Sequence, residues 1–465
     1  MSYEEFYARI EETAKQFRNQ EGPIRVITHL DTDGLTSASI LIKALKREEK
    51  IFIVSVVKQI TEQVLTQIAK ESYPVVMFLD LGSGNLQQIN NLLKEKTVFI
   101  LDHHQMQESS FSGYHINPLL FNVSSQEISG AGLAYLFAKA LNIKNRESAH
   151  LAIIGAIGDM QEKKGFSGIN AEILKEASTI EVKMGLRMFG TQTRPLHKVL
   201  EYSYDPYIPG VTGSESHAIH FIEEMGIPLK ENGKFRKLMH LSSEETKKLI
   251  TAIIVKRLGS EKTPEDIFGP IYLLKDEEEE LPTKDLKEFS TLLNCCGRMN
   301  KPSLGIGTCL NDPDFKQKAI ELLFSYKREI ITSLNWFYAH RKTEAVKEEE
   351  NFVIIHAEEN IKDTLIGTIC SILTNSGVYK EGTILLGLAH TLDNNVKISM
   401  RVVGKKEINL KEILGEITKR VGCESGGHNY AAGSLIPQEK EQEFLESALV
   451  ILKKRAMEEV ISNKN

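Results

Sequence analysis

The first part of the sequence alternates short apolar runs with longer stretches of helical periodicity. The apolar runs lie at 24–28, 51–57, 75–79 and 97–101, and helical patterns such as 35–47 and 62–71 lie between them. This alternation continues to about Gly190 and indicates a parallel sheet whose strands are connected by covering helices. In such sheets, ligands bind outside the carboxyl ends of the strands. The sequence therefore predicts an α/β domain with its functional site at that edge of the sheet.

Acidic residues and histidines follow four apolar runs, where such a site is expected. Three of these runs are predicted strands, and the fourth, LAIIGAIG, we place with them as a further strand end. Carboxylates gathered in one buried pocket repel one another unless cations neutralise them. The pattern therefore predicts two divalent metal ions. The residues concerned are His29, Asp31 and Asp33, then Asp80, then Asp102, His103 and His104, and finally Asp159.

Local spacing suggests how these groups act. His29, Asp31 and Asp33 alternate, and in an extended segment alternate side chains point the same way. Gly34 then permits a sharp turn into a helix beginning near Leu35. Asp80, which precedes the flexible LGSG, is best placed to bridge two ions. The adjacent His103 and His104 offer one imidazole for a metal and another for substrate, and Asp102 can orient one of them.

The types of ligand limit which metal ions the site can bind and which reaction it can catalyse. Mixed imidazole and carboxylate sets suit Mn²⁺ best, with Mg²⁺, Co²⁺ or Zn²⁺ as alternatives. Two such ions ~4 Å apart can activate a bridging hydroxide and clamp both oxygens of an in-line displacement at phosphorus. The sequence has neither a Ser-His-Asp arrangement nor a Walker loop to support a different chemistry. A two-metal phosphoesterase is therefore predicted.

Composition indicates a soluble globular protein. Of the 465 residues, 41% are hydrophobic and 26% are charged, and the net charge is −6. We expect a cytoplasmic protein with no membrane association, because no apolar run reaches ~18 residues and the N-terminus reads as an acidic helix. The five cysteines form no CxxC pair, which favours buried free thiols in a reducing compartment.

Four segments are expected along the chain. Residues 1–195 form the parallel-sheet domain, and residues 196–290 form a helical insertion or accessory module without a chemical motif. Residues 291–345 include a long linker helix that starts near Asn311 and can extend to about Ala345. Residues 346–465 form a smaller α/β domain, with strands near 352–357, 383–389 and 396–401 and a glycine-rich loop at 424–428.

Several motifs together resemble a known family. THLDTDG, FLDLGSG, LDHHQ and AIGDM resemble the four motifs of the DHH phosphoesterase superfamily, and SGGHNYAAG resembles the glycine-rich motif of its DHHA1 partner domain. TLLNCCGRMNKPSLGIGTCL at 291–310 resembles the asparagine-and-arginine segment of RecJ-type nucleases. Nearly the whole chain is covered, apart from about 200–285. The sequence is most similar to the archaeal RecJ-like, GINS-associated nucleases, which share ancestry with the DHH-derived subunit of the eukaryotic replicative helicase.

The resemblance implies a role for each matching residue. It implies that His29, Asp31 and Asp80 hold one metal ion, and that Asp33, Asp80, His103 and Asp159 hold the second. His104 and Arg298 would contact the scissile phosphate with Asn294 nearby, while Asp102 orients a histidine. In the DHHA1 domain, Arg401, Gly426, Gly427 and His428 would grip the nucleic-acid backbone. One departure is Ser425, which stands where many relatives have the first of three glycines.

Together, these expectations predict a Mn²⁺- or Mg²⁺-dependent exonuclease that acts on single-stranded DNA, RNA or both in replication or repair. Its substrate cleft would lie between the DHH and DHHA1 domains. Tyr430, Trp336 and Phe337 are candidate base-stacking residues, although Trp336 and Phe337 also fit packing within the linker helix. One alternative is a phosphodiesterase for short oligonucleotides or cyclic dinucleotides. Another is a replisome scaffold associated with GINS and the replicative helicase.

Overall fold

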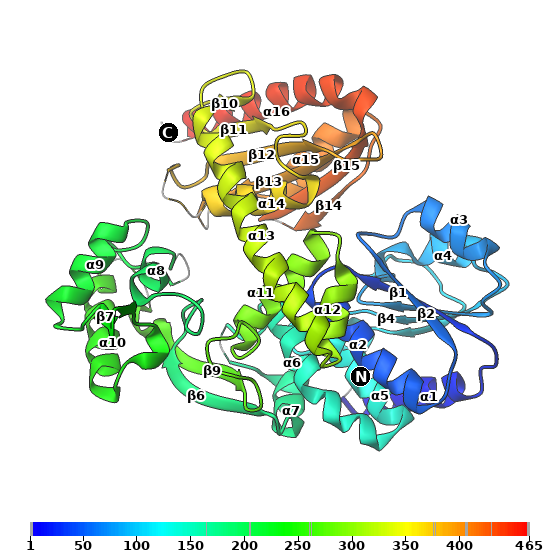
Figure 1. Cartoon of the computed structure of the whole chain (residues 1–465). Helices are drawn as coiled ribbons and strands as arrows, with labels where there is room; N and C mark the ends of the chain where they lie inside the picture. Colours follow the sequence, from blue (N-terminus) through cyan, green and yellow to red (C-terminus); the bar gives the residue numbers. More distant parts are fainter. Residues whose placement is uncertain are drawn as a thin grey trace. The chain divides into compact units, whose positions relative to one another are not determined.

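The chain divides into two compact units, and each is described separately (Figure 1). Unit 1 is Met1–Leu323 and unit 2 is Phe324–Asn465. The computed structural model describes residues 3–163, 165–203, 206–259, 261, 263–374, 376, 378–404, 408–428 and 430–462. Within these ranges, no helix is both long enough and apolar enough to cross a membrane.

Unit 1 contains the predicted parallel sheet. Its five strands are ordered β2-β1-β3-β4-β5, and each neighbouring pair is parallel. The carboxyl ends of β1, β3 and β4 therefore meet at one edge, as the sequence predicts. The strands are β1 (Ile24–His29), β2 (Phe52–Val57), β3 (Val75–Leu79), β4 (Thr97–Leu101) and β5 (Tyr114–Ile116).

The inner strands β1, β3 and β4 are buried on both faces because apolar side chains occupy both alternating sets of positions. Val76 and Phe78 of β3 pack in the core formed with α3 and α4. On the opposite face, Phe99 of β4 meets Phe17 of α1 edge-on, with ring centroids 5.2 Å apart. The helices around the sheet are α1 (Tyr3–Arg18), α2 (Thr32–Arg47), α3 (Glu62–Lys70), α4 (Leu86–Leu92), α5 (Gly130–Leu141), α6 (Ala149–Gly158) and α7 (Gly168–Glu176).

The accessory part of unit 1 is built on an antiparallel ribbon as well as helices. Strand β6 (Ile180–Leu186) pairs with β9 (Phe268–Leu274), and the segments between them form a separate apolar core. Two members of that core, Leu186 and Met188, lie before residue 196, which was the expected first residue of the accessory module. The elements between the two strands are α8 (Leu196–Glu201), α9 (Glu215–Glu224), β7 (Lys230–Glu231), β8 (Lys234–Phe235) and α10 (Ser243–Arg257).

Three helices complete this part of the chain. Helices α11 (Leu286–Arg298) and α12 (Pro302–Cys309) pack against α2. Helix α13 (Pro313–Ala339) is the predicted linker helix, and the boundary between the two units falls inside it. It ends at Ala339 rather than near Ala345, because the chain turns there toward strand β10. Short 3₁₀ helices in unit 1 lie at Ser83–Asn85, Pro118–Phe121, Ile143–Ser148, Leu238–His240 and Pro264–Ile267.

Unit 2 is the predicted smaller α/β domain. Its sheet has the order β10-β11-β12-β13-β15-β14, in which β11 and β12 are parallel and the other neighbours antiparallel. Helices α15 and α16 cover one face of the sheet, and α14 packs on β12 and β13. The elements are β10 (Val346–Glu348), β11 (Phe352–His356), α14 (Asp363–Thr374), β12 (Ile384–His390), β13 (Asn395–Val402), α15 (Leu410–Arg420), β14 (Ser425–His428), β15 (Ala431–Pro437), the 3₁₀ helix Gln438–Lys440 and α16 (Glu441–Ser462).

The glycine-rich segment of unit 2 is a strand rather than the predicted loop. Ser425–His428 forms β14 and pairs antiparallel with β15. Glycine is tolerated there because β14 is the edge strand of the sheet. At Gly427, φ is 133° and an added Cβ would lie 2.3 Å from the Ala431 carbonyl oxygen. The glycine is therefore required by the close approach of β15.

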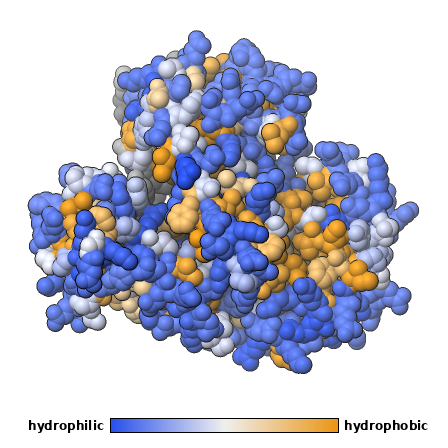
Figure 2. Space-filling model, in the orientation of Figure 1, coloured by the Kyte–Doolittle hydropathy of each residue, from blue (hydrophilic) through white to orange (hydrophobic). Residues whose placement is uncertain are grey.

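Two other features bear on the sequence analysis. The described cysteines are free thiols, and all of them except the partly exposed Cys423 are buried as predicted. The space-filling view shows apolar residues gathered over the part of unit 1 that holds β1 and β2 (Figure 2). Ile51 and Ile53, beside and within the edge strand β2, are among the exposed apolar side chains.

Replacing Phe17 tests how α1 is held on the sheet. The Phe17 ring packs against Phe99 and also against Phe137, 5.4 Å away. We expect Phe17→Ala to lower the free energy of unfolding by about 3–5 kcal/mol, because the cavity it leaves loses both aromatic contacts. Urea unfolding of the full chain, followed by circular dichroism, measures this change.

Phe324→Ala is the matched control. The Phe324 side chain is 63% exposed, so its removal should change the free energy of unfolding by no more than about 0.5 kcal/mol. Equal losses for the two variants would contradict the packing described for α1.

Candidate metal centre

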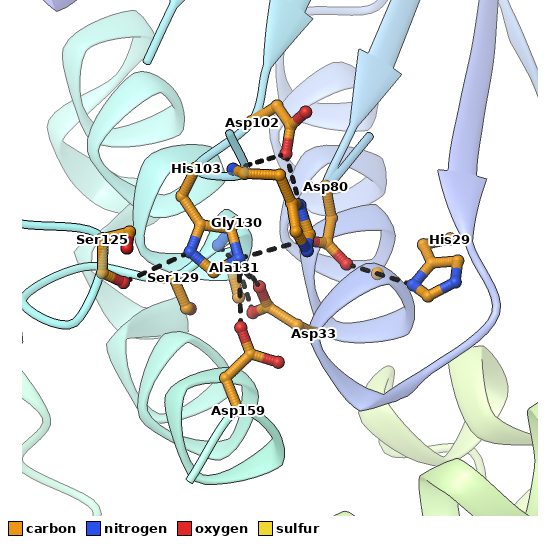
Figure 3. Close-up of polar contacts among 12 residues, drawn as sticks. His29, Asp33, Asp80, Asp102, His103, Ser125, Ser129, Gly130, Ala131 and Asp159 are labelled. Carbon is orange, nitrogen blue, oxygen red and sulfur yellow. Dashed lines mark hydrogen bonds and ion pairs between the residues drawn. The ribbon is translucent and has the colours of Figure 1, made fainter. Parts of the chain in front are cut away.

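Side chains from three parallel strands meet at one edge of the sheet in unit 1 (Figure 3). His29 is the last residue of β1, Asp80 directly follows β3, and Asp102 and His103 follow β4. Because β1, β3 and β4 are neighbours in the sheet, their ends bring these residues together. The sequence prediction that these strand ends meet is confirmed.

A first group of candidate ligands consists of His29, Asp31 and Asp80. Their ligand atoms all lie within 4.8 Å of one another. The His29 Nδ1 atom is 2.9 Å from Asp31 Oδ2 and 3.6 Å from Asp80 Oδ2. These three residues have the donor types and the separations that one divalent ion requires.

A second group consists of Asp33, His103 and Asp159, which also lie within 4.8 Å of one another. The His103 Nε2 atom is 3.0 Å from Asp159 Oδ2 and 3.6 Å from Asp33 Oδ2. The same nitrogen is 3.4 Å from Asp80 Oδ1. Asp80 therefore directs one oxygen toward each group.

Asp80 is held in a backbone conformation that side chains rarely adopt. Its φ is 58°, in the left-handed region, where a residue other than glycine is strained by about 1–3 kcal/mol. Its amide donates to the Leu101 carbonyl, with the two atoms 2.9 Å apart. The side chain is only 2% exposed, and this backbone turn aims it between the two ligand groups.

The local structure of the His29–Asp33 segment differs from the prediction. Helix α2 begins at Thr32 rather than near Leu35, so the three ligands do not alternate along an extended segment. Asp31 is the N-cap residue, and its side chain accepts a hydrogen bond from the Gly34 amide. Asp33 points to the second group from the first helical turn. Gly34 is needed for space, because an added Cβ would lie 2.3 Å from the His29 carbonyl oxygen.

Asp159 reaches the site from a helix and not from the predicted strand end. The apolar run LAIIGAIG belongs to α6, and Asp159 is the C-cap residue of that helix. The run lacks an amphipathic stripe because almost every residue of α6 is buried, and such a run cannot be distinguished from a buried strand by periodicity.

The structure adds supports for the ligands that the sequence analysis missed. The amides of Gly130 and Ala131, at the start of α5, donate to the two oxygens of Asp33 at 2.6 and 2.9 Å. These are amides of a helix N-terminus, which favours negative charge. His103 Nδ1 donates to the Ser125 carbonyl at 3.3 Å, which leaves Nε2 facing the carboxylates. The sequence feature that could have indicated these amides is Ser129, a good N-cap residue before a glycine-rich apolar helix.

Asp102 is hydrogen-bonded to His104, one of the two histidines that it was expected to orient. Asp102 Oδ1 accepts from His104 Nδ1 at 2.7 Å, and Asp102 Oδ2 accepts from the Ser83 amide at 2.8 Å. Burial lowers the pKa of His104, but the hydrogen bond and the charge of Asp102 raise it by more, to about 8. The His104 side chain is 51% exposed, so this imidazole is accessible beside the buried ligands.

The pocket brings buried carboxylates and imidazoles so close together that the pKa values of several of them are raised. Burial and repulsion from Asp80 and Asp159 raise the pKa of Asp33 well above its usual range. Burial opposes protonation of His103, but Asp159 and Asp80 raise the pKa of this imidazole well above its usual range. Within the described residues, His29 Nδ1, His103 Nε2 and both Asp80 oxygens are buried without a hydrogen-bond partner. These converging atoms fit two divalent cations.

The predicted phosphate-contact segment lies next to the segment that carries the candidate ligands His29, Asp31 and Asp33. Asn294 accepts a hydrogen bond from the Thr32 amide at 3.0 Å, and so fixes the start of α2. At Gly297 an added Cβ would lie 1.8 Å from the Leu30 carbonyl oxygen, so α11 approaches the ligand-carrying segment closely. Arg298 follows at the end of α11 and is half-buried.

The predicted substrate contacts of unit 2 lie on its sheet. Arg401 is in β13, where its Nε donates to Ser371 Oγ of α14 at 3.1 Å. Gly426 and Gly427 are in β14, as is His428, whose side chain lies outside the described part of the structure. Tyr430 is 50% exposed.

The two candidate base-stacking residues of α13, Trp336 and Phe337, differ in their surroundings. Phe337 is fully buried, which agrees with packing rather than base stacking. Trp336 stacks on His340, with ring centroids 4.7 Å apart.

Comparison with known sequences identifies three family domains. Residues 23–158 match the N-terminal domain of the DHH family, residues 188–268 the DHH-CID domain and residues 350–454 the DHHA1 domain. An uncharacterized protein of Methanocaldococcus jannaschii is 32% identical over 92% of both chains. The single-stranded-DNA-specific exonuclease RecJ of Thermus thermophilus is 27% identical over 36% of this chain and 26% of its own length.

Solved structures show the same fold. RecJ of Thermus thermophilus in complex with Mn²⁺ matches with a TM-score of 0.57 and 17% identity, over 97% of this chain and 54% of RecJ. CDC45 of Entamoeba histolytica matches with a TM-score of 0.59 and 14% identity, over 97% of this chain and 99% of CDC45.

Adding a methyl group at Gly155 tests the packing behind the ligands. A Cβ there would lie 2.4 Å from Asp33 Oδ1, 2.5 Å from Ala131 Cβ and 2.7 Å from Thr36 Oγ1. We expect Gly155→Ala to lower the free energy of unfolding by about 1–3 kcal/mol. It should also weaken divalent-cation binding, because Asp33 must move. Urea unfolding and calorimetric titration measure the two effects.

Gly84→Ala provides the control, since a Cβ at Gly84 has no neighbour within 4 Å. It should keep the stability and cation affinity of the parent protein. Parent-like cation affinity in Gly155→Ala would show that the close contact with Asp33 does not position this ligand.

Proposed function

The chain is a member of the DHH family, related to single-strand DNA exonucleases, and on this premise we propose that it is a metal-dependent phosphodiesterase that degrades single-stranded nucleic acid. The proposal rests most strongly on Asp80. Its two buried oxygens lack hydrogen-bond partners among the described residues and face two separate groups of ligands. A single carboxylate shared by two cations would account for this arrangement.

Each proposed ion has a defined set of residues. His29, Asp31 and Asp80 would hold one ion, while Asp33, Asp80, His103 and Asp159 would hold the other. The mixed oxygen and nitrogen donors suit Mn²⁺ best, with Mg²⁺ or Co²⁺ also compatible. When bound, two such ions activate a water molecule and neutralise charge on a phosphodiester. Protons on Asp33 and the histidines must leave as the ions bind, so affinity should fall with falling pH.

The surrounding residues orient these groups. The Gly130 and Ala131 amides fix both oxygens of Asp33, and the Ser125 carbonyl fixes the tautomer of His103 by accepting from Nδ1. Asp102 accepts a hydrogen bond from His104 Nδ1 and favours the protonated form of this imidazole. A protonated, half-exposed imidazole suits contact with a phosphate oxygen. Arg298 is the second proposed phosphate contact, and Asn294 supports the ligand loop by binding Thr32.

The substrate is proposed to be single-stranded DNA, RNA or both, with Arg401 and the Gly426–His428 strand contacting its backbone. The relationship to RecJ favours a long single strand over a cyclic dinucleotide. A scaffold role with GINS and the replicative helicase remains a second prediction. The likeness to CDC45 is at the level of fold, and it does not require loss of the intact ligand set.

Removing the bridging carboxylate tests the enzymatic proposal. With Mn²⁺ present, we expect Asp80→Asn to cut single strands at least about 10³-fold more slowly, because transition-state stabilisation of several kcal/mol is lost. EDTA should abolish cleavage by the parent protein. Gel analysis of 5′- and 3′-labelled DNA and RNA strands measures the rate, and its product ladders also report direction and sugar preference.

Asp314→Asn is the matched control, because Asp314 is exposed at the start of α13. It should cleave at the parent rate. Full activity in EDTA, or parent-like activity in Asp80→Asn, would contradict the two-metal proposal. Cleavage of cyclic dinucleotides but not of long strands would instead support the alternative substrate.

Replacing His104 separates a phosphate contact from a metal ligand. His104 is proposed to bind substrate, yet its Nδ1 is also 3.8 Å from Asp80 Oδ1. We expect His104→Gln to lower kcat/KM about 10²–10³-fold, as for the loss of one transition-state hydrogen-bond donor. The Mn²⁺ content measured after dialysis should stay unchanged. Loss of one Mn²⁺ per chain would instead make His104 a ligand.

A further inference from the structure

A second cluster of potential ligands lies in unit 2. His356 is the last residue of β11, His390 is the last residue of β12, and Glu441 is the first residue of α16. Strands β11 and β12 are parallel neighbours, so their carboxyl ends carry both histidines to the same edge of the sheet. The start of α16 places a carboxylate against them.

The three side chains share one narrow space. His356 Nε2 is 3.0 Å from Glu441 Oε1, and His390 Nε2 is 2.9 Å from Glu441 Oε2. The ligand atoms all lie within 4.8 Å of one another. The side chains of His390 and Glu441 are each 13% exposed, and that of His356 is 26% exposed. The cluster is thus shielded but still reachable from solvent.

We propose that His356, His390 and Glu441 bind one divalent transition-metal ion, with Zn²⁺ as the preferred ion. Two imidazoles and a carboxylate are a donor set that Zn²⁺ accepts, at about 2.0–2.2 Å from each atom. Ligand atoms arranged tetrahedrally at that distance are separated from one another by about 3.4 Å, and the ligand atoms of this cluster lie within 4.8 Å of one another. Three protein ligands leave one position for water or an anionic group.

Gln438 supplies the orientation that such a site needs. Its side-chain amide nitrogen Nε2 lies 3.3 Å from His390 Nδ1, and rotation of the amide by half a turn would bring its oxygen to the same place. With the amide oxygen turned to this nitrogen, Gln438 would accept from Nδ1–H and leave the lone pair of Nε2 directed at the ion. Metal-binding histidines usually donate the other ring nitrogen to such an acceptor. Gln438 is therefore proposed as a positioning residue.

The alternative is a hydrogen-bonded clamp without a metal. In that case each imidazole carries a proton on Nε2 and donates it to one oxygen of Glu441. The clamp and the metal site use the same residues but differ in those protons, which a metal must displace. Metal stoichiometry therefore distinguishes the two.

The test is Zn²⁺ binding by the full chain, measured by equilibrium dialysis and elemental analysis. We expect His390→Ala and Glu441→Gln each to hold one Zn²⁺ fewer per chain than the parent protein, while ions in unit 1 remain. His217→Ala and Glu443→Gln are matched controls at exposed positions, and they should keep the parent stoichiometry. Gln438→Ala should weaken the affinity for one ion about tenfold.

Circular dichroism separates loss of the site from loss of folding. Glu441→Gln preserves the size of the side chain and its capacity to accept a hydrogen bond, so it should remain folded. Parent-like zinc stoichiometry in folded Glu441→Gln, together with unchanged affinity in Gln438→Ala, would overturn the proposal and leave a hydrogen-bonded clamp.

Discussion

Unit 1 depends on the placement of several carboxylates in one buried pocket. Asp33 and Asp80 are 1% and 2% exposed, and burial together with repulsion between the two carboxylates raises the pKa of Asp33. Such a pocket is stable only if other groups supply positive potential or protons. In this chain the positive potential comes from the amides of α5, the imidazoles of His29 and His103, and the proposed cations.

The backbone around the pocket is shaped by this requirement. Gly130 starts α5 close enough to Asp33 for its amide to donate, and an added Cβ there would lie 2.7 Å from Asp80 Cβ. Gly155 lets α6 cross against the same carboxylate. The strained φ of Asp80 fits the same picture, because only a left-handed turn after β3 aims this side chain between the ligand groups. Packing, strain and charge are therefore adjusted to a single site.

The sequence predicts those parts of the site that depend on periodicity and strand order. His29, Asp80 and His103 follow short apolar runs, and parallel neighbours must bring their ends together. It does not predict the start of α2, because an Asp before a helix fits a ligand and an N-cap equally well, and Asp31 has the geometry of both. Asp159 follows a helix buried on all sides, which has no period to identify it. Gly130 and Gly155 act through contacts with residues far away in the sequence, which no local pattern contains.

The two histidine clusters differ in how their polar atoms are satisfied. In unit 1, His29 Nδ1, His103 Nε2 and both Asp80 oxygens lack hydrogen-bond partners among the described residues. In unit 2, each Nε2 is paired with its own oxygen of Glu441. A metal there must compete with two formed hydrogen bonds, whereas a metal in unit 1 relieves an existing repulsion. We therefore expect the site in unit 2 to bind ions more weakly and to require a stronger Lewis acid such as Zn²⁺, while the oxygen-rich site in unit 1 suits Mn²⁺.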